Sequence, residues 1–530
     1  MKQVDRRSFI KSSAAAAGLV AAAPLYRTIA YAGTASEGPF VHGLASGDPL
    51  PNGAIIWTRL TPSDDATPGS GKGRSTEVKW EVAADPGFRD VVRKGELTTQ
   101  PRSDHSAKVD VSGLKPDTRY YYRFKAVGES SPIGRLITAP DPTSSPSNVR
   151  FGLASCSNYE AGFFSGYRYL AERDDLDFVM HLGDYIYEYG RGEYGQADAI
   201  KRYHQPNHEI LSLEDYRIRH AQYKADEDLA ALHAAHPFIV TWDDHEVADN
   251  AWKGGAVNHQ SEEERNFRLR RADAYKAYFE WMPIRLPAPR RDRTRIYRKL
   301  NYGRLADVFM LDLRQYRDEQ GGTGDGSADD PDRTLTGRAQ FEWLKRGLVG
   351  SERRWHIIGN ELMFVPFEAP KTVPFNTDSW DGYRVERDGL VKHIAQKQID
   401  NVVFLTGDIH SSWAADVPAE RETYPVGGSA AVEFVGTSIT SDNLDEITGS
   451  EPRTTSLGVE NGIIANNSHI KMIEFDSHGY SVVDVSDERC QIDWYYLSDR
   501  GDPQATQSFA QAWKTDAGAN SAVETDEPIT

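Results

Sequence analysis

The sequence predicts an α/β protein in which a small β-sandwich precedes a larger layered domain. Residues 38–140 contain short alternating strands separated by turn residues, a pattern typical of a fibronectin- or immunoglobulin-like sandwich. From residue 149 to about residue 514, apolar strand-like runs alternate with charged helical segments, as in sheets covered by helices. The Pro/Ser-rich stretch 139–147 lies between the two regions and marks the predicted domain boundary.

The N-terminal region carries the clearest strand signals. Apolar and polar residues alternate over 54–60 and 77–82, which predicts strands with one buried face. A Leu-x-Pro turn at 114–116 leads into the tyrosine-rich run 119–124. This arrangement predicts a tyrosine corner, in which a tyrosine hydroxyl binds the backbone a few residues upstream.

The larger region alternates between strand and helix patterns. Helices are predicted at 166–173, 213–235, 261–281 and 336–348, and over 213–235 the apolar residues recur three and four positions apart. Strands are predicted at 149–155, 177–183, 238–242, 306–312, 355–359, 402–406, 431–435 and 480–485. The acidic, Ala/Thr-rich end, 515–530, lacks periodicity and is predicted to be disordered.

Bulk composition excludes some classes of function. The 530 residues carry a formal net charge of −18, so the surface field disfavours binding of bulk nucleic acid. No internal run is long enough to span a bilayer, and no transmembrane anchor is expected. The only cysteines, Cys156 and Cys490, could form one disulfide but not a disulfide scaffold.

The first residues predict an export signal. Arg6 and Arg7 are followed by Phe9 and Lys11, then by a weakly apolar, Ala-rich segment and by Ala30-Tyr31-Ala32. This is the pattern of a twin-arginine signal peptide covering residues 1–32. It predicts that the twin-arginine translocase carries the folded protein to the periplasm or the exterior. The alternative interpretation is a short amphipathic helix of the mature protein.

Four predicted strand ends carry potential metal ligands. They are Ser155-Cys156, Gly183-Asp184 with Tyr187, the stretch Asp243 to Asn250, and Gly407-Asp408 with His410. Singly, each has a simple explanation, such as a buried thiol or a helix cap. Together they crowd carboxylates at one sheet edge, where these would repel one another and lose hydration. A bound cation removes that cost, so the four stretches together predict a metal centre.

The ligand types indicate two different ions. A Tyr187 phenolate and a Cys156 thiolate both stabilise a trivalent ion, which indicates Fe³⁺ rather than Zn²⁺. The oxygens of Asp244, Asn250 and Asp408 suit a divalent ion such as Ca²⁺, Mn²⁺ or Mg²⁺. Asp184 is the carboxylate expected to be shared between the two ions.

These motifs resemble a known family. Gly183-Asp184-x-x-Tyr187, Asp244-His245-Glu246 and Gly407-Asp408-x-His410 resemble the calcineurin-like metallophosphoesterase motifs, and the Tyr resembles the purple acid phosphatase variant. More closely, the chain resembles the alkaline phosphatase D (PhoD-like) family. The further matches are His42-Gly43-x-Ala45-Ser46-Gly47-Asp48-Pro49, Trp57-Thr58-Arg59, Ser155-Cys156, His181 to Glu188 and Leu311-Asp312-x-Arg314-Gln315-Tyr316-Arg317.

The resemblance implies a layered metallophosphoesterase-type fold and an iron–calcium site. Cys156, Asp184, Tyr187 and His410 resemble the iron ligands; Asp184, Asp244, Asn250 and Asp408 fall where calcium ligands are expected. The chain departs from the wider superfamily at two positions. Asp244 stands where Asn is usual, and Asn360 stands near the place of a His in related phosphatases.

The expected activity is hydrolysis of phosphate monoesters, diesters or both at alkaline pH by a metal-bound hydroxide. His245 is the predicted catalytic residue, protonating the leaving group, with orientation of Asp244 as the alternative. Asn360 and Arg314 are candidate phosphate contacts, although an Arg314 ion pair with Asp312 or Asp318 is favoured. The alternatives are a phospholipase D-type phosphodiesterase acting on phospholipid headgroups, with teichoic-acid-type esters as further substrates, and a non-catalytic cell-envelope metal-binding protein.

Overall fold

The computed structural model describes residues 38–529, except 196–199, 261, 287–292 and 368–375. The predicted signal peptide, residues 1–32, lies outside the described residues. No helix of the described chain is both long and apolar enough to cross a membrane.

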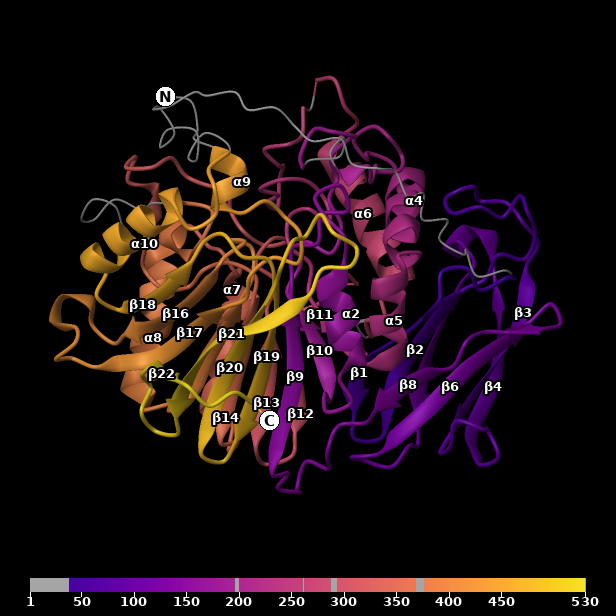
Figure 1. Cartoon of the computed structure of the whole chain (residues 1–530), viewed down its shortest axis with the longest axis horizontal. Helices are drawn as coiled ribbons and strands as arrows, with labels where there is room; N and C mark the ends of the chain where they lie inside the picture. Colours follow the sequence, from indigo (N-terminus) through magenta and orange to yellow (C-terminus); the bar gives the residue numbers. More distant parts are fainter. Residues whose placement is uncertain (1–37, 196–199, 261, 287–292, 368–375, 530) are drawn as a thin grey trace.

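Two large mixed sheets pack face to face, and a third, smaller sheet lies at the right-hand side of Figure 1. In the described chain the first sheet runs β22 (Val523–Thr525), β21 (Gln507–Asp516), β20 (Arg489–Leu497), β19 (Gly479–Ser486), β9 (Asn148–Ala154), β10 (Phe178–His181), β11 (Pro237–Val240), β1 (Leu44–Leu50), β2 (Gly53–Arg59) and β5 (Ser106–Ser112). The second runs β12 (Arg298–Tyr302), β13 (Ala306–Met310), β14 (Trp355–Asn360), β15 (Val402–Thr406), β17 (Ser429–Val435), β16 (Ser412–Pro418) and β18 (Ile470–Glu474).

Apolar side chains fill the space between the two large sheets. Phe151, Met180 and Val483 of the first sheet share one buried cluster with Val308 and Leu405 of the second. The strands of this core are buried on both faces, which explains why their sequences are nearly continuous apolar runs. The two-sheet core sets the relative position of the strand ends at which the predicted ligands lie.

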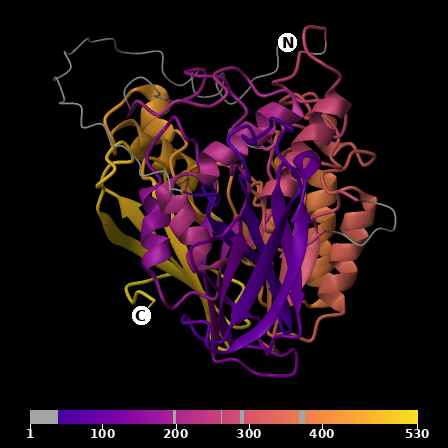
Figure 2. The same ribbon diagram turned by 90° about the vertical axis from the view of Figure 1, so that its right-hand side faces the viewer.

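Helices cover the outer face of each large sheet, and Figure 2 shows them on either side of the strands. The first sheet is covered by α2 (Ser165–Glu172), α4 (Leu213–Lys224), α5 (Glu227–Ala235) and α6 (Phe267–Trp281). The second is covered by α7 (Arg338–Val349), α8 (Arg384–Lys397) and α10 (Thr455–Asn466). The shorter elements are α9 (Leu444–Thr448), η1 (Pro101–Ser103), η2 (Ser327–Asp329), η3 (Trp380–Tyr383) and η4 (Arg421–Thr423). The predicted fold class is therefore confirmed.

The N-terminal sandwich, drawn in indigo in Figure 1, shares a sheet with the rest of the chain. Its outer sheet contains β4 (Val91–Thr99), β3 (Thr76–Ala83), β6 (Arg119–Ala126), β7 (Glu129–Ser130) and β8 (Gly134–Ile137). Its other sheet is β1, β2 and β5, and β1 pairs in parallel with β11 of the larger region. The tyrosine corner is confirmed, because the Lys115 N–H donates to the Tyr120 hydroxyl at 3.0 Å.

Two sequence-based expectations need correction, and one possibility left open by the sequence is decided. The single helix predicted at 213–235 is two helices, because the Asp226 side chain accepts hydrogen bonds from Asp228 N and Leu229 N and starts α5. The prediction of a disordered tail is also wrong. β22 pairs with β21, and Ile529 is buried, with its N–H donating to Asp493 at 2.6 Å. Cys156 and Cys490 are both buried and do not form the disulfide that the cysteine count allowed.

Candidate metal centre

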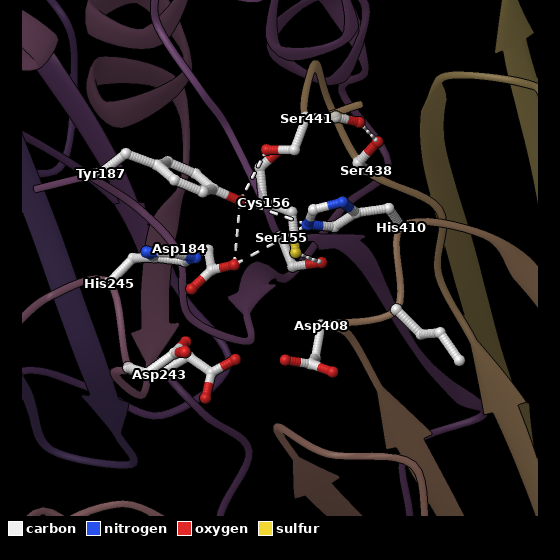
Figure 3. A network of polar contacts seen from close by, with 12 residues as sticks. Ser155, Cys156, Asp184, Tyr187, Asp243, His245, Asp408, His410, Ser438 and Ser441 are labelled. Carbon is white, nitrogen blue, oxygen red and sulfur yellow. Dashed lines mark hydrogen bonds and ion pairs between the residues drawn. The ribbon is translucent and has the colours of Figure 1, made fainter. Parts of the chain in front are cut away.

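The predicted ligands meet at one edge of the two large sheets. Cys156 follows β9, Asp184 follows β10 and Asp244 follows β11, all in the first sheet. Asp408 and His410 follow β15 in the second sheet. β9, β10 and β11 pair in parallel with one another, and β15 pairs in parallel with β14. The carboxyl ends of these strands therefore converge, as Figure 3 shows for the side chains.

The ligands form groups that share members. Single ligand atoms of Cys156, Asp184 and His410 lie within 4.8 Å of one another. The same holds for Asp184, Asp244 and His245, and for Asp243, Asp244 and Asp408. The Tyr187 hydroxyl joins the first group, lying 2.9 Å from Asp184 Oδ2 and 3.3 Å from His410 Nε2. Asp184 thus lies between a thiol-, phenol- and imidazole-containing group and a carboxylate-rich group, as expected of a shared ligand.

Five of the seven candidate ligands have left-handed backbone conformations. Their φ values are +59° for Cys156, +52° for Asp184, +52° for Asn250, +64° for Asp408 and +56° for His410. Each such residue costs on the order of 1–3 kcal/mol unless the surrounding structure compensates. Strain concentrated on these residues indicates that the fold is built to aim their side chains into one place.

Two glycines allow the strand ends to approach one another. A Cβ at Gly183, where φ is +99°, would lie 2.6 Å from the backbone nitrogen of Asp243. A Cβ at Gly407 would lie 2.9 Å from the Ser155 Cβ and 2.8 Å from its Oγ. The Gly of each Gly-Asp motif is therefore required by close packing of neighbouring loops.

Buried negative charge at this edge fits a cation. The side chains of Asp184, Asp243, Asp244 and Asp408 are each at most 3% exposed. The guanidinium of Arg314 lies among them, bound to Asp243 and 3.3–3.4 Å from Asp244 and Asp408. Asp184 Oδ1 makes no hydrogen bond within the described chain. One guanidinium against four buried carboxylates leaves the charge that metal ions would balance.

Burial and charge shift the pKa values of two further site residues. Burial, with the nearby Asp184 carboxylate, raises the pKa of the Tyr187 phenol well above its ordinary value. A cation would be needed to convert it to the phenolate. Burial opposes protonation of His245, but Asp244, Asp184 and Glu188 outweigh it and raise the pKa of His245 well above its ordinary value.

Two residues predicted from the sequence as phosphate contacts are used differently. Among the described ion pairs, the Arg314 guanidinium has none with Asp312 or Asp318, although its backbone N–H donates to Asp312 at 3.3 Å. Besides the site carboxylates, the guanidinium binds Asp378 at 3.0 Å. Asn360 is occupied inside the fold. Its amide donates to Leu362 O and to Thr406 Oγ1, and its oxygen accepts from Trp380 Nε1 at 2.9 Å. This overturns its assignment as a phosphate contact.

Asn250 lies beside the carboxylate-rich group. Its N–H donates to Asp244 Oδ2 at 2.6 Å. Its side-chain NH₂ group faces Asp378, and the amide nitrogen lies 2.9 Å from Oδ1 and 3.2 Å from Oδ2 of that carboxylate. Its role as a ligand remains a prediction.

Several residues that support the candidate ligands and His245 were not predicted from the sequence. Glu188 Oε2 lies 2.7 Å from His245 Nδ1, and Glu188 Oε1 accepts from Asp249 N and Asn258 Nδ2. Ser441 contacts Tyr187 from a loop that follows β17. Glu188 adjoins Tyr187 in the quoted motif and could have been singled out, whereas Ser441 has no local signal.

Comparisons with known proteins agree with this geometry. Residues 151–494 match the PhoD-like phosphatase family, and residues 27–140 match the N-terminal domain of PhoD-like phosphatases. The chain is 39% identical over 506 residues to alkaline phosphatase D of Bacillus subtilis (strain 168), covering 92% of this chain and 84% of that protein. The chain belongs to the PhoD-like phosphatase family. A solved structure described as PhoD superposes with a TM-score of 0.84 at 36% identity, covering 96% of this chain and 94% of the other.

Membership of the PhoD-like phosphatases makes the protein an enzyme that hydrolyses phosphoric ester bonds. The resemblance inferred from the motifs is therefore confirmed. The converging ligand groups give this family member candidate sites for metal ions.

Proposed function

We propose that the protein hydrolyses phosphate monoesters, diesters or both at alkaline pH with two kinds of metal ion. Fe³⁺ would be held by Cys156, Asp184, Tyr187 and His410. Ca²⁺, with Mn²⁺ or Mg²⁺ as alternatives, would be held by Asp184, Asp244, Asn250 and Asp408. The observation that carries the proposal is the sharing of Asp184 between a group with a thiol and a phenol and a group of carboxylates.

The metal ions would neutralise phosphoryl oxygens and lower the pKa of bound water, which is the chemistry they supply in phosphatases. The chain's own contribution is to hold the ligands in place and to manage the leaving-group proton. Glu188 binds His245 Nδ1 and thereby leaves Nε2 as the nitrogen that can face the substrate. His245 can then hold a proton at Nε2 for the departing alkoxide.

Aromatic rings pack around this histidine. The ring centroid of His245 lies 4.2 Å from that of Tyr187 and 5.5 Å from that of Tyr189. The imidazole is only 2% exposed. These contacts limit its rotation and exclude water, which favours transfer of its proton to the leaving group rather than to solvent.

Metal analysis and hydrolysis assays test the proposal together. The purified protein is expected to contain iron and a divalent ion and to hydrolyse chromogenic monoesters or diesters. Cys156→Ala is expected to lose iron and colour, and Asp184→Ala to lose both metals and activity. A colourless, iron-free but active enzyme would refute the iron assignment.

His245→Ala separates proton donation from support of Asp244. If His245 protonates the leaving group, the variant keeps its metals and loses about 10²–10⁴-fold in turnover on poor leaving groups, but much less on good ones. An equal loss on both substrates, accompanied by metal loss, would instead assign His245 to holding Asp244.

We also propose that the twin-arginine motif at Arg6 and Arg7 exports the folded enzyme to the periplasm or the exterior. Replacing both residues with Lys is expected to leave the activity in the cell interior. Unchanged export of that variant would contradict the proposal.

A further inference from the structure

Two serine hydroxyls contact the two ligands that distinguish this centre. Ser441 Oγ lies 2.6 Å from the Tyr187 hydroxyl oxygen, and Ser155 Oγ lies 3.2 Å from Cys156 Sγ. Figure 3 shows both serines beside the ligands. Ser441 is fully buried and Ser155 is 2% exposed, so water does not compete strongly for either hydroxyl.

The protonated side chains of Tyr187 and Cys156 each donate a hydrogen bond. The Tyr187 phenol donates to Asp184, and the Cys156 thiol donates to Ser155. Metal ligation needs the phenolate and the thiolate, so one proton leaves each side chain. Both atoms then become acceptors, and each has a serine hydroxyl already within reach.

We infer that Ser441 and Ser155 are positioning residues of the metal centre, donating hydrogen bonds to the Tyr187 phenolate and the Cys156 thiolate. The inference rests on the proposed function, because it assumes that Tyr187 and Cys156 bind metal. Hydrogen bonds to charged atoms are stronger than those to neutral ones, so these contacts strengthen when the ligands lose their protons. They withdraw electron density from the two ligands and orient them toward the ion.

The structure separates this role from simple support of the loop. Ser441 Oγ also lies 2.9 Å from the Cys156 carbonyl oxygen, which accepts from the N–H groups of Thr440 and Ser441 as well. The Cys156 carbonyl therefore keeps two donors if the Ser441 hydroxyl is removed. Tyr187 would lose its serine contact altogether.

Ser438 provides a matched control in the same loop. Its hydroxyl binds Ser441 O at 2.7 Å and His478 Nδ1 at 3.0 Å, without contacting Tyr187 or Cys156 in the described hydrogen bonds. Ser438→Ala removes a buried loop hydroxyl of the same kind. Ser441→Thr keeps the hydroxyl at position 441 and provides the conservative comparison.

The test follows metal binding and visible absorption of the full-length protein rather than activity. Metal-free samples are titrated with Fe³⁺. Ser441→Ala is expected to shift the phenolate-to-iron band to longer wavelength and to weaken Fe³⁺ binding by about 10–100-fold. Ser155→Ala is expected to shift only the thiolate band, while Ser438→Ala leaves both bands in place and Ser441→Thr restores the phenolate band.

A parallel titration with Co²⁺ makes the result independent of which metal is native. In it, Ser155→Ala is expected to shift the thiolate-to-cobalt band and Ser441→Ala to weaken Co²⁺ binding. If iron does not bind but these cobalt effects appear, the iron assignment fails and the serine roles stand. Unchanged spectra and affinities in both serine-to-alanine variants, or an equal change in Ser438→Ala, would overturn the inference.

Discussion

Glu246 is expected to hold the ligand loops together, and Glu246→Gln tests this directly. Its Oε1 accepts from Tyr185 N at 2.5 Å and Ile186 N at 3.2 Å. Its Oε2 accepts from Asp184 N at 3.1 Å and Asp243 N at 2.6 Å. One buried carboxylate therefore binds the loop after β10 to the loop after β11.

The expected cost follows from these four bonds. Glutamine replaces one oxygen with an NH₂ group, which cannot accept a hydrogen bond, so two buried N–H groups lose their acceptor. Each such loss costs about 1–3 kcal/mol, giving about 2–6 kcal/mol in the free energy of unfolding. The Asp184 loop would also loosen, and a reduction of about 10–100-fold in metal affinity is expected.

Glu386→Gln is the matched control. Glu386, on α8, accepts from Leu335 N at 2.8 Å and Thr336 N at 3.0 Å, and its described hydrogen bonds reach none of the ligand loops. Chemical denaturation should show lower stability for both variants, whereas metal content and hydrolysis should fall only for Glu246→Gln. Wild-type metal content and turnover in Glu246→Gln would refute the role assigned to Glu246.

Three further predictions follow from single contacts. Asp184→Asn should lower binding of both metal ions together, measured by metal analysis after dialysis; loss of one ion alone would show that Asp184 is not shared. Ile529→Ala should lower the free energy of unfolding by about 2 kcal/mol in denaturant titrations, whereas a disordered tail would give no change. Burial raises the pKa of Asp177 to about 6, so this carboxyl loses its proton at a lower pH in the unfolded chain than in the folded one. The free energy of unfolding therefore falls as pH rises from about 4 to about 6. Asp177→Asn keeps an acceptor for Arg150 N and should raise stability above pH 6 by on the order of 1 kcal/mol, with little effect near pH 4; equal effects at both pH values would contradict this.

Much of the candidate metal centre could be predicted from short stretches of sequence. An apolar run followed by Gly-Asp identifies a buried strand and a tight turn, as at Gly183-Asp184 and Gly407-Asp408. Parallel strands place such ends at the same edge of a sheet, so the ligands were expected to meet. The tyrosine corner at Tyr120 was predictable for a similar reason, because both partners lie within six residues.

Other features depend on which distant groups arrive at a position. Arg314 has acidic residues close to it in sequence, yet its guanidinium binds Asp243, 71 residues away. The side-chain amide of Asn360 hydrogen-bonds to Trp380 and Thr406, so it no longer counts among the predicted phosphate contacts. No local pattern reports such pairings, because they are set by the packing of separate loops.

The sequence alone determined the candidate ligands, the strands that carry them and the fold class, because hydrophobic periodicity and turn chemistry act over a few residues. The tertiary structure decided how those ligands are supported. Ser441 reaches Tyr187 across 254 positions of the chain, and Ile529 is buried only because β22 extends the sheet beside β21. Such contacts are decided by the register and packing of whole elements, which stabilise a buried polar group only when its distant partner is in place.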